Sequence, residues 1–155
     1  MNRLNEGLAI VEMNAGHIEA IAAIEKLCFS NPWSQNALRE ELNNPLAAFF
    51  TAEFDGRPVG YAGMIAVVEE GYIANIAVHP DSRRRGIATA LLGRLSSFAL
   101  EKGLSMLTLE VRQSNKAAIK IYESAGFSQV GVRRGFYENP QEDALIMTKY
   151  FTKDD

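Results

Sequence analysis

The sequence predicts a mixed α/β protein, in which a central sheet carries helices on both of its faces. Apolar stretches rich in β-branched and aromatic residues supply seven candidate strands, and stretches with helical periodicity supply four candidate helices. These elements follow in the order strand, two helices, three strands, helix, strand, helix and two strands. Consecutive strands favour antiparallel pairing and strands separated by a helix favour parallel crossovers, so a mixed sheet is expected. A chain of 155 residues is expected to form one domain over residues 1–155.

The first part of the chain predicts one strand and two helices. Residues 8–13 are apolar with β-branched side chains, which is typical of a strand. Asn14 is a suitable cap for a helix that reaches about Cys28, and Ser34 is a suitable cap for a second helix that ends before Pro45. The apolar side of the first helix is formed by Ile18, Ile21, Ala22 and Ile24.

The remaining elements are separated by turn and cap signals. A three-strand meander is expected over residues 47–54, 59–68 and 72–78, with turns at 55–58 and 69–71. The second half predicts a helix over 86–102, a strand over 104–112, a helix over 115–125, a strand over 127–133, a loop over 135–142 and a strand over 144–151. Glycines just after the two helices are typical of helix ends.

Charge and cysteine content exclude several classes of protein. The net charge is −3, but residues 1–80 carry −6 and residues 81–155 carry +3, which suggests ligands of opposite charge unless the distribution is random. A single cysteine excludes a disulfide framework, and two histidines without zinc-type spacing predict no metal. The N-terminus has no long apolar run, so we expect no signal peptide, no membrane span and a cytoplasmic location.

The most informative segment joins a predicted strand to a predicted helix between residues 78 and 92. Three arginines and Gly86 precede the helix, whose first backbone N–H groups and positive dipole end favour an anion. This context is typical of a pyrophosphate site, although neither the P-loop nor the dinucleotide-binding pattern is present. A solvated basic patch and nucleic-acid phosphate are the alternatives. Nucleic acid is not our expectation, because the patch is short and the chain is acidic.

Here the sequence resembles a known family. Arg83-x-x-Gly86-x-Ala88 is similar to the [QR]xxGx[GA] acetyl-CoA loop of the GNAT superfamily of N-acyltransferases. The segments 75–80, 109–112 and 115–127 resemble the family's fourth strand, its fifth strand and the following helix, in that order. The resemblance implies a GNAT fold, a mostly antiparallel sheet of about seven strands, and acetyl-CoA as cosubstrate.

A narrower resemblance extends over nearly the whole chain. The segments 31–34, 109–112, 133–137 and 142–147 are similar to the ribosomal-protein-alanine N-acetyltransferase branch (RimI type). That branch acetylates the N-terminal alanine of a small-subunit ribosomal protein, so the resemblance implies a protein N-terminus as the acceptor. Many relatives have Gln where this chain has Arg83 and a second Gly where it has Ala88. Both variants fit the superfamily pattern.

The resemblance implies a set of cofactor contacts. The backbone of Ile76, Ala77 and Val78 would hold the thioester and pantetheine arm as an added strand would. The pyrophosphate would lie against the loop and first helical turn, formed by Arg83, Arg84, Arg85, Gly86, Ile87, Ala88 and Thr89. Asn115 would contact the cofactor farther along, although helix capping explains this residue equally well.

Two residues are implied as catalytic. Glu110 is the implied general base, because a carboxylate inside an apolar strand is costly unless it has a task or a partner. The alternative is an outward-facing residue paired with Arg112 or Lys120. Tyr122 is the implied general acid for the departing thiolate, with a packed aromatic ring as the alternative.

The peptide groove is assigned less directly. Trp33 and Tyr137, with Phe136, are expected to line it, and each could equally be a core aromatic. Two other functions stay open at this stage. One is a GNAT enzyme acting on a small amine such as a polyamine or an amino sugar, and the other is a module that binds CoA or nucleic-acid phosphate without catalysis.

Overall fold

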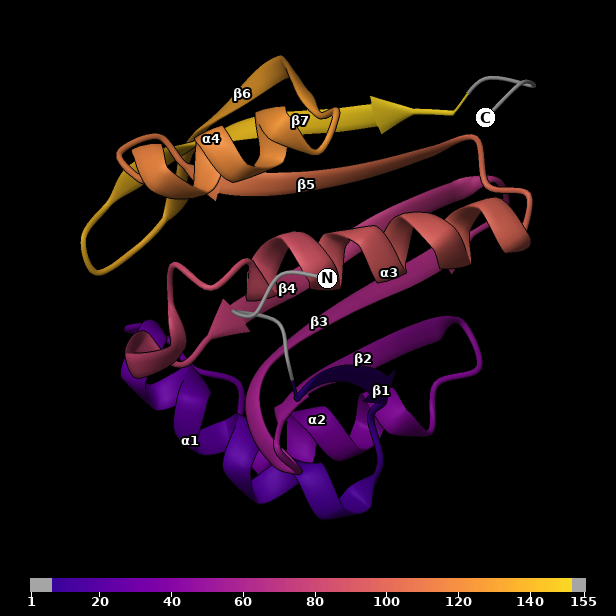
Figure 1. Cartoon of the computed structure of the whole chain (residues 1–155). Coiled ribbons are helices and arrows are strands. Elements are labelled where there is room, and N and C mark those ends of the chain that lie inside the picture. The colour runs from indigo at the N-terminus through magenta and orange to yellow at the C-terminus, as the bar shows by residue number, and fades with distance from the viewer. Residues whose placement is uncertain (1–6, 152–155) are drawn as a thin grey trace.

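The computed structural model describes residues 7–151 and contains one seven-stranded sheet in the order β1-β2-β3-β4-β5-β7-β6 (Figure 1). All neighbouring strands pair antiparallel except β4 and β5, which pair parallel. The predicted mixed, mostly antiparallel sheet is therefore confirmed. The strands are β1 (Leu8–Glu12), β2 (Ala47–Phe54), β3 (Arg57–Val67), β4 (Glu70–Val78), β5 (Met106–Arg112), β6 (Ser128–Tyr137) and β7 (Glu142–Tyr150).

Helices cover both faces of this sheet, as predicted. The α-helices are α1 (Ile18–Cys28), α2 (Gln35–Leu42), α3 (Ile87–Glu101) and α4 (Lys116–Ser124), and short 3₁₀ turns occur at η2 (Ala15–His17) and η3 (Pro80–Ser82). Figure 1 shows α3 running along β3 and β4, with α4 beside β5 and β7. The caps at Asn14 and Ser34 form as expected, since each side chain accepts a backbone N–H of its first turn.

The two faces of the sheet have separate hydrophobic cores. Neighbouring residues on β2 point in opposite directions, so Phe50 packs in the core under α3, whereas Phe49 packs in the core with α1 and α2. On β3, Ala62 and Tyr61 divide in the same way. Tyr122 of α4 belongs to the α3 core, which places α3 and α4 on the same face.

The sheet divides at the junction of β4 and β5. Their parallel pairing covers three residue pairs, from Glu70 with Met106 to Tyr72 with Thr108. Beyond Tyr72 the two strands diverge, so the second half of β4 pairs with β3 alone. A register shift in β3–β4, where Gly63 pairs with Asn75 and Met64 with Ile73, leaves Ala74 as an extra residue at this point.

Two predicted segments differ from the structure. The helix expected from Asn14 begins with the η2 turn, and its α-helical part starts at Ile18. The predicted loop over 135–142 is wrong in its first half, because β6 continues to Tyr137 and leaves only residues 138–141 as the connection. Gly135 has a positive φ of 64° and donates its N–H to the Asp143 side chain at 2.8 Å, so an irregular strand continues through a typical turn residue.

Candidate active site

The free edge of β4 is the first component of the candidate site. His79 donates its backbone N–H to Val59 of β3 at 2.7 Å. Because hydrogen-bonding residues alternate along an antiparallel pair, Ala77 and Asn75 are directed toward β3, and the backbone groups of Ile76 and Val78 face the side of β5. Of the three predicted backbone contacts, the structure therefore brings Ile76 and Val78 to the open edge and turns Ala77 away from it.

The loop before α3 is the second component. Arg84 and Gly86 both have positive φ values, of 66° and 75°, and Gly86 is the N-cap residue of α3. No side chain caps this helix start. The first-turn N–H groups, which include those of the predicted residues Ile87, Ala88 and Thr89, therefore lack side-chain acceptors, and the helix end can receive an anion.

The three arginines of this loop have different surroundings. Arg83 donates from Nε to the carbonyl of Val78 at 3.3 Å and from Nη2 to the Cys28 sulfur at 3.3 Å. The guanidinium of Arg85 lies 5.5 Å from the ring centre of Phe54. Arg83 and Arg85 thus hold the loop to the sheet, and the exposed Arg84 is directed to solvent.

Glu110 is the most strongly enclosed charged group at the divergence of β4 and β5. Its side chain is 6% exposed and ion-paired with Arg133 of β6 at 3.4 Å. Tyr72 of β4 donates its hydroxyl to the other carboxylate oxygen at 2.5 Å. The carboxylate has neither of the partners considered from sequence, Arg112 or Lys120, because its neighbours come from other strands. Burial and the hydrogen bond to Glu110 raise the pKa of Tyr72.

Tyr122 lies at the buried side of the same region. Its ring packs against Phe127 with the ring centres 6.1 Å apart, and 7% of the residue is exposed. Burial raises the pKa of Tyr122, and the nearby Tyr137 adds to this rise. The phenol is therefore protonated at neutral pH. Its packed ring agrees with the structural alternative.

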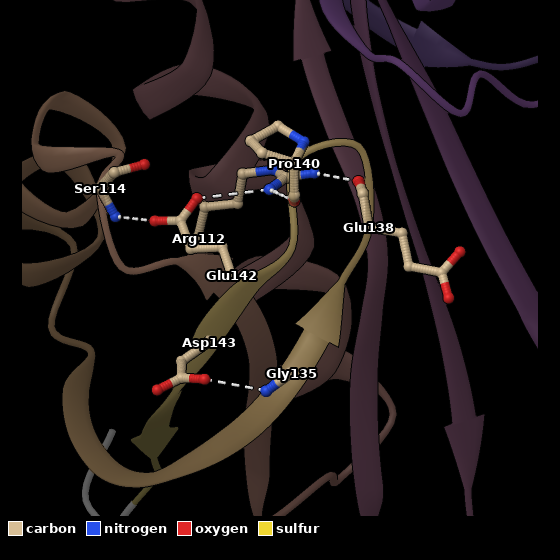
Figure 2. Close-up of polar contacts among 7 residues, drawn as sticks. All are labelled: Arg112, Ser114, Gly135, Glu138, Pro140, Glu142 and Asp143. Carbon is tan, nitrogen blue, oxygen red and sulfur yellow. Dashed lines mark hydrogen bonds and ion pairs between the residues drawn. The ribbon is translucent and has the colours of Figure 1, made fainter.

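Arg112 organises the connection between β6 and β7 (Figure 2). Its guanidinium donates to the backbone carbonyls of Glu138 and Pro140, each at 2.8 Å, and pairs with Glu142 at 3.3 Å. Glu142 in turn accepts the backbone N–H of Ser114 at the entrance to α4. A single side chain thus joins the end of β5, the β6–β7 hairpin and the α4 entrance.

Tyr137 is held by the same arginine. The Arg112 guanidinium lies 4.5 Å from the Tyr137 ring centre, and Phe136 packs edge-on against that ring at 5.0 Å. Burial and the charge of Glu110 raise the pKa of Tyr137 to about 12, while Arg112 lowers it. Tyr137 therefore lies close enough to Glu110 for the charge of that carboxylate to raise the pKa of Tyr137.

Two other predicted site residues have mainly structural contacts. Trp33 is partly buried and packs against Phe49 in the α1–α2 core, with the ring centres 6.0 Å apart. Asn115 caps α4, since its side-chain oxygen accepts the N–H of Ala118 at 3.2 Å. The capping explanation for Asn115 is therefore confirmed.

Sequence reasoning missed the roles of four residues of this region, although Arg112 and Arg133 lie in segments that carry the family resemblance. Tyr72, Arg133 and Arg112 act through partners on other strands, which no local pattern indicates. Glu25 had a detectable signal, because it follows Ile21 by one helical turn and so lies on the apolar side of α1. It is fully buried and accepts hydrogen bonds from Tyr61 and Asn75.

Comparison with known proteins establishes the class. Residues 18–127 match the acetyltransferase (GNAT) family, which covers more than half of the chain, and the protein belongs to this family. More narrowly, it is 34% identical over 140 residues to the ribosomal protein bS18-alanine N-acetyltransferase of Escherichia coli, covering 89% of this chain and 94% of the relative. It is 40% identical over 131 residues to the enzyme of the same name from Salmonella typhimurium, covering 80% and 84%.

The structural comparison agrees with the sequence comparison. The crystal structure of the ribosomal-protein-S18-alanine N-acetyltransferase from Escherichia coli superposes with a TM-score of 0.86 at 33% identity, covering 94% of each chain. Across residues 7–151, no helix is long and apolar enough to cross a membrane. The same residues contain no cluster of three or more potential metal ligands.

Proposed function

We propose that this protein transfers the acetyl group of acetyl-CoA to the N-terminal α-amine of a protein, and that its substrate is the N-terminal alanine of ribosomal protein bS18. The observation that carries the proposal is the divergence of β4 and β5, with an enclosed carboxylate beside an unpaired strand edge. The similarity to bS18-alanine N-acetyltransferases over nearly the whole chain supports the choice of substrate.

The residues present fit acetyl-CoA. The backbone groups of Ile76 and Val78 that face away from β3 have no partner strand beyond Tyr72, although side chains contact them. This edge suits the thioester and the extended pantetheine arm, whose amide groups can pair as an added strand does. The uncapped start of α3 with Gly86 in the left-handed region suits the pyrophosphate, and Arg84 is free to add its charge. The bound thioester supplies the acetyl carbon that the amine attacks, in one direct step without an acyl-enzyme.

Glu110 acts as the general base in this proposal. An α-amine has a pKa near 7.7–8.0, against about 10.4 for lysine, so a protein N-terminus is partly neutral at physiological pH and needs modest help. Glu110 takes a proton from the amine nitrogen, directly or through one water molecule, as the new amide bond forms. Tyr72 and Arg133 hold the carboxylate in a fixed position for this step.

Tyr122 acts as the general acid. The leaving thiolate belongs to a thiol with a pKa close to that of cysteine, about 8.5, and a phenol can return the proton to it. Burial raises the pKa of Tyr122, so the phenol is protonated before the reaction and gives up its proton less readily than a free tyrosine would. Tyr137 and Trp33 are the proposed contacts for the first residues of the peptide.

The decisive experiment compares acceptor substrates. We expect the purified protein to acetylate a hexapeptide with the N-terminal residues of bS18, and to leave spermidine and an N-terminally blocked copy of the peptide unmodified. Glu110→Gln should reduce kcat about 100-fold or more while the KM for acetyl-CoA stays near wild type. Faster turnover of spermidine than of the peptide would refute the substrate assignment, and an unchanged kcat would refute the role of Glu110.

A further inference from the structure

A buried polar network lies behind the free edge of β4, and our inference about it rests on the proposed function. Glu25 of α1 is 0% exposed, and its Oε1 accepts hydrogen bonds from Tyr61 Oη and Asn75 Nδ2, both at 2.7 Å. Within the described part of the chain, its Oε2 has no hydrogen-bond partner, although the backbone N–H of Trp33 is close enough to lower the pKa of this carboxyl. Burial raises the pKa of Glu25, and the hydrogen bond from Tyr61 acts in the opposite direction. Packing alone would favour an apolar side chain here.

Asn75 connects this network to the strand edge. Its Nδ2 lies 2.7 Å from Glu25 Oε1 and 3.1 Å from Tyr61 Oη, so the orientation of the amide is determined by two partners. The opposite end of the same amide, Oδ1, accepts the backbone N–H of Ile76 at 3.0 Å. Asn75 also follows directly after Ala74, the extra residue of the β3–β4 bulge, where the backbone has least support from its neighbours.

The N–H of Ile76 is a donor on the open side of β4. In the proposed function this N–H is one of two backbone groups available to the thioester end of acetyl-CoA. Because this N–H is already donated to Asn75 Oδ1, an acceptor arriving from the β5 side would share the donor in a three-centre hydrogen bond. Any rotation of the peptide plane before Ile76 would redirect this donor.

We propose that Glu25 and Asn75 form a positioning pair, in which Glu25 orients the Asn75 amide and Asn75 aims the Ile76 N–H at the acetyl carbonyl of acetyl-CoA. Neither side chain touches the substrate. The required feature of Glu25 is the oxygen that accepts from Asn75, rather than its negative charge. Loss of the pair should therefore weaken recognition of the acetyl group specifically, because free CoA has no carbonyl at this position.

The test compares two ligands on the same protein. The dissociation constants of acetyl-CoA and of free CoA are measured by calorimetry for wild type and Asn75→Ala. In the variant, the preference for acetyl-CoA over CoA should fall about threefold to tenfold, the value of one hydrogen bond, with a parallel fall in kcat and no change in the affinity for CoA. An unchanged or increased preference overturns the proposal.

Variants of the other two residues separate positioning from general stability. Tyr61→Phe removes a 2.7 Å donor to the same Glu25 oxygen and the 3.1 Å acceptor of Asn75 Nδ2, but it leaves the Glu25–Asn75 hydrogen bond. It should therefore lower the melting temperature and reduce the ligand preference less than Asn75→Ala does. Glu25→Gln retains the oxygen that accepts from Asn75, so it should keep the preference for acetyl-CoA over CoA. Glu25→Leu removes that oxygen and should lose the preference. Equal losses in Tyr61→Phe and Asn75→Ala overturn the positioning role. If wild type binds neither ligand, the proposed function itself is overturned.

Discussion

The anchoring of the β6–β7 hairpin by Arg112 leads to a quantitative prediction. Arg112→Met keeps most of the aliphatic stem and removes the guanidinium. Besides the ion pair with Glu142, which contributes little because it is partly exposed, the substitution deletes three contacts. These are two hydrogen bonds to the hairpin carbonyls, at 2.8 Å each, and the cation–π contact with Tyr137 at 4.5 Å. At about 1 kcal/mol for each of these three contacts, the free energy of unfolding should fall by about 3 kcal/mol.

Arg94 supplies a matched control. Its guanidinium also lies 4.5 Å from an aromatic ring centre, that of Phe50, and it also pairs with an acidic residue, Glu101, at 3.9 Å. Its side chain is 32% exposed, against 25% for Arg112. Neither of these two contacts involves a loop carbonyl. Arg94→Met should therefore cost about 1 kcal/mol, that of the cation–π contact.

Urea unfolding followed by tryptophan fluorescence measures both variants. The expected difference between them is about 2 kcal/mol, the contribution of the two carbonyl hydrogen bonds. Because the hairpin carries Tyr137, Arg112→Met should also raise the KM for the peptide substrate, whereas Arg94→Met should not. Equal destabilisation by the two substitutions would refute the reasoning that hydrogen bonds to the hairpin, rather than charge and stacking, account for the role of Arg112.

Three further predictions concern the catalytic and structural groups. Tyr122→Phe should lower kcat about tenfold or more with little effect on substrate KM, and normal turnover would show that the ring serves packing alone. Gly86→Ala places a β-carbon on a residue with φ of 75° and should cost about 1 kcal/mol of stability and weaken CoA binding, and an unchanged CoA dissociation constant would contradict the pyrophosphate placement. The hydrogen bond from Ser114 holds the pKa of Glu142 below its ordinary value, so its stabilisation is present above about pH 4.3 and lost as the pH falls further. The melting temperature of Glu142→Gln should accordingly lie below that of wild type at pH 7 and approach it in acid, and a constant difference would contradict this assignment.

Local chemistry made most of the elements predictable. Ser34 and Asn14 cap their helices through hydrogen bonds to nearby backbone N–H groups, so the signal and the structure lie within a few residues of each other. The turn at Asp55 and Gly56 has two positive φ values of 52° and 82°, as expected for a hairpin with these residues. The segment over 135–142 was mispredicted because its strand character depends on β7, and Gly135 by itself resembles a turn residue.

The candidate site was predictable only in its separate parts. Arg83 to Thr89 were identifiable as a candidate phosphate loop, because such a loop is a contiguous segment whose function depends on backbone conformation. Glu110 was identifiable from the family resemblance, and from the cost of a carboxylate in an apolar strand. Its partners Tyr72 and Arg133 were not, because a pairing between strands leaves no mark in either segment alone. Glu25 could have been found as a charged residue on the apolar side of a helix.

The sequence by itself determined the order of the elements, the loop before α3 and the family to which the chain belongs, because each of these depends on local periodicity, capping or a contiguous motif. The tertiary structure alone decided where β4 and β5 separate, which backbone groups of β4 have no partner strand, and which side chains enclose Glu110 and Glu25. Strand order brings together residues that are distant along the chain, and the energies that determine it arise from packing across the sheet. The site therefore belongs to the divergence of two strands, a feature that no single segment encodes.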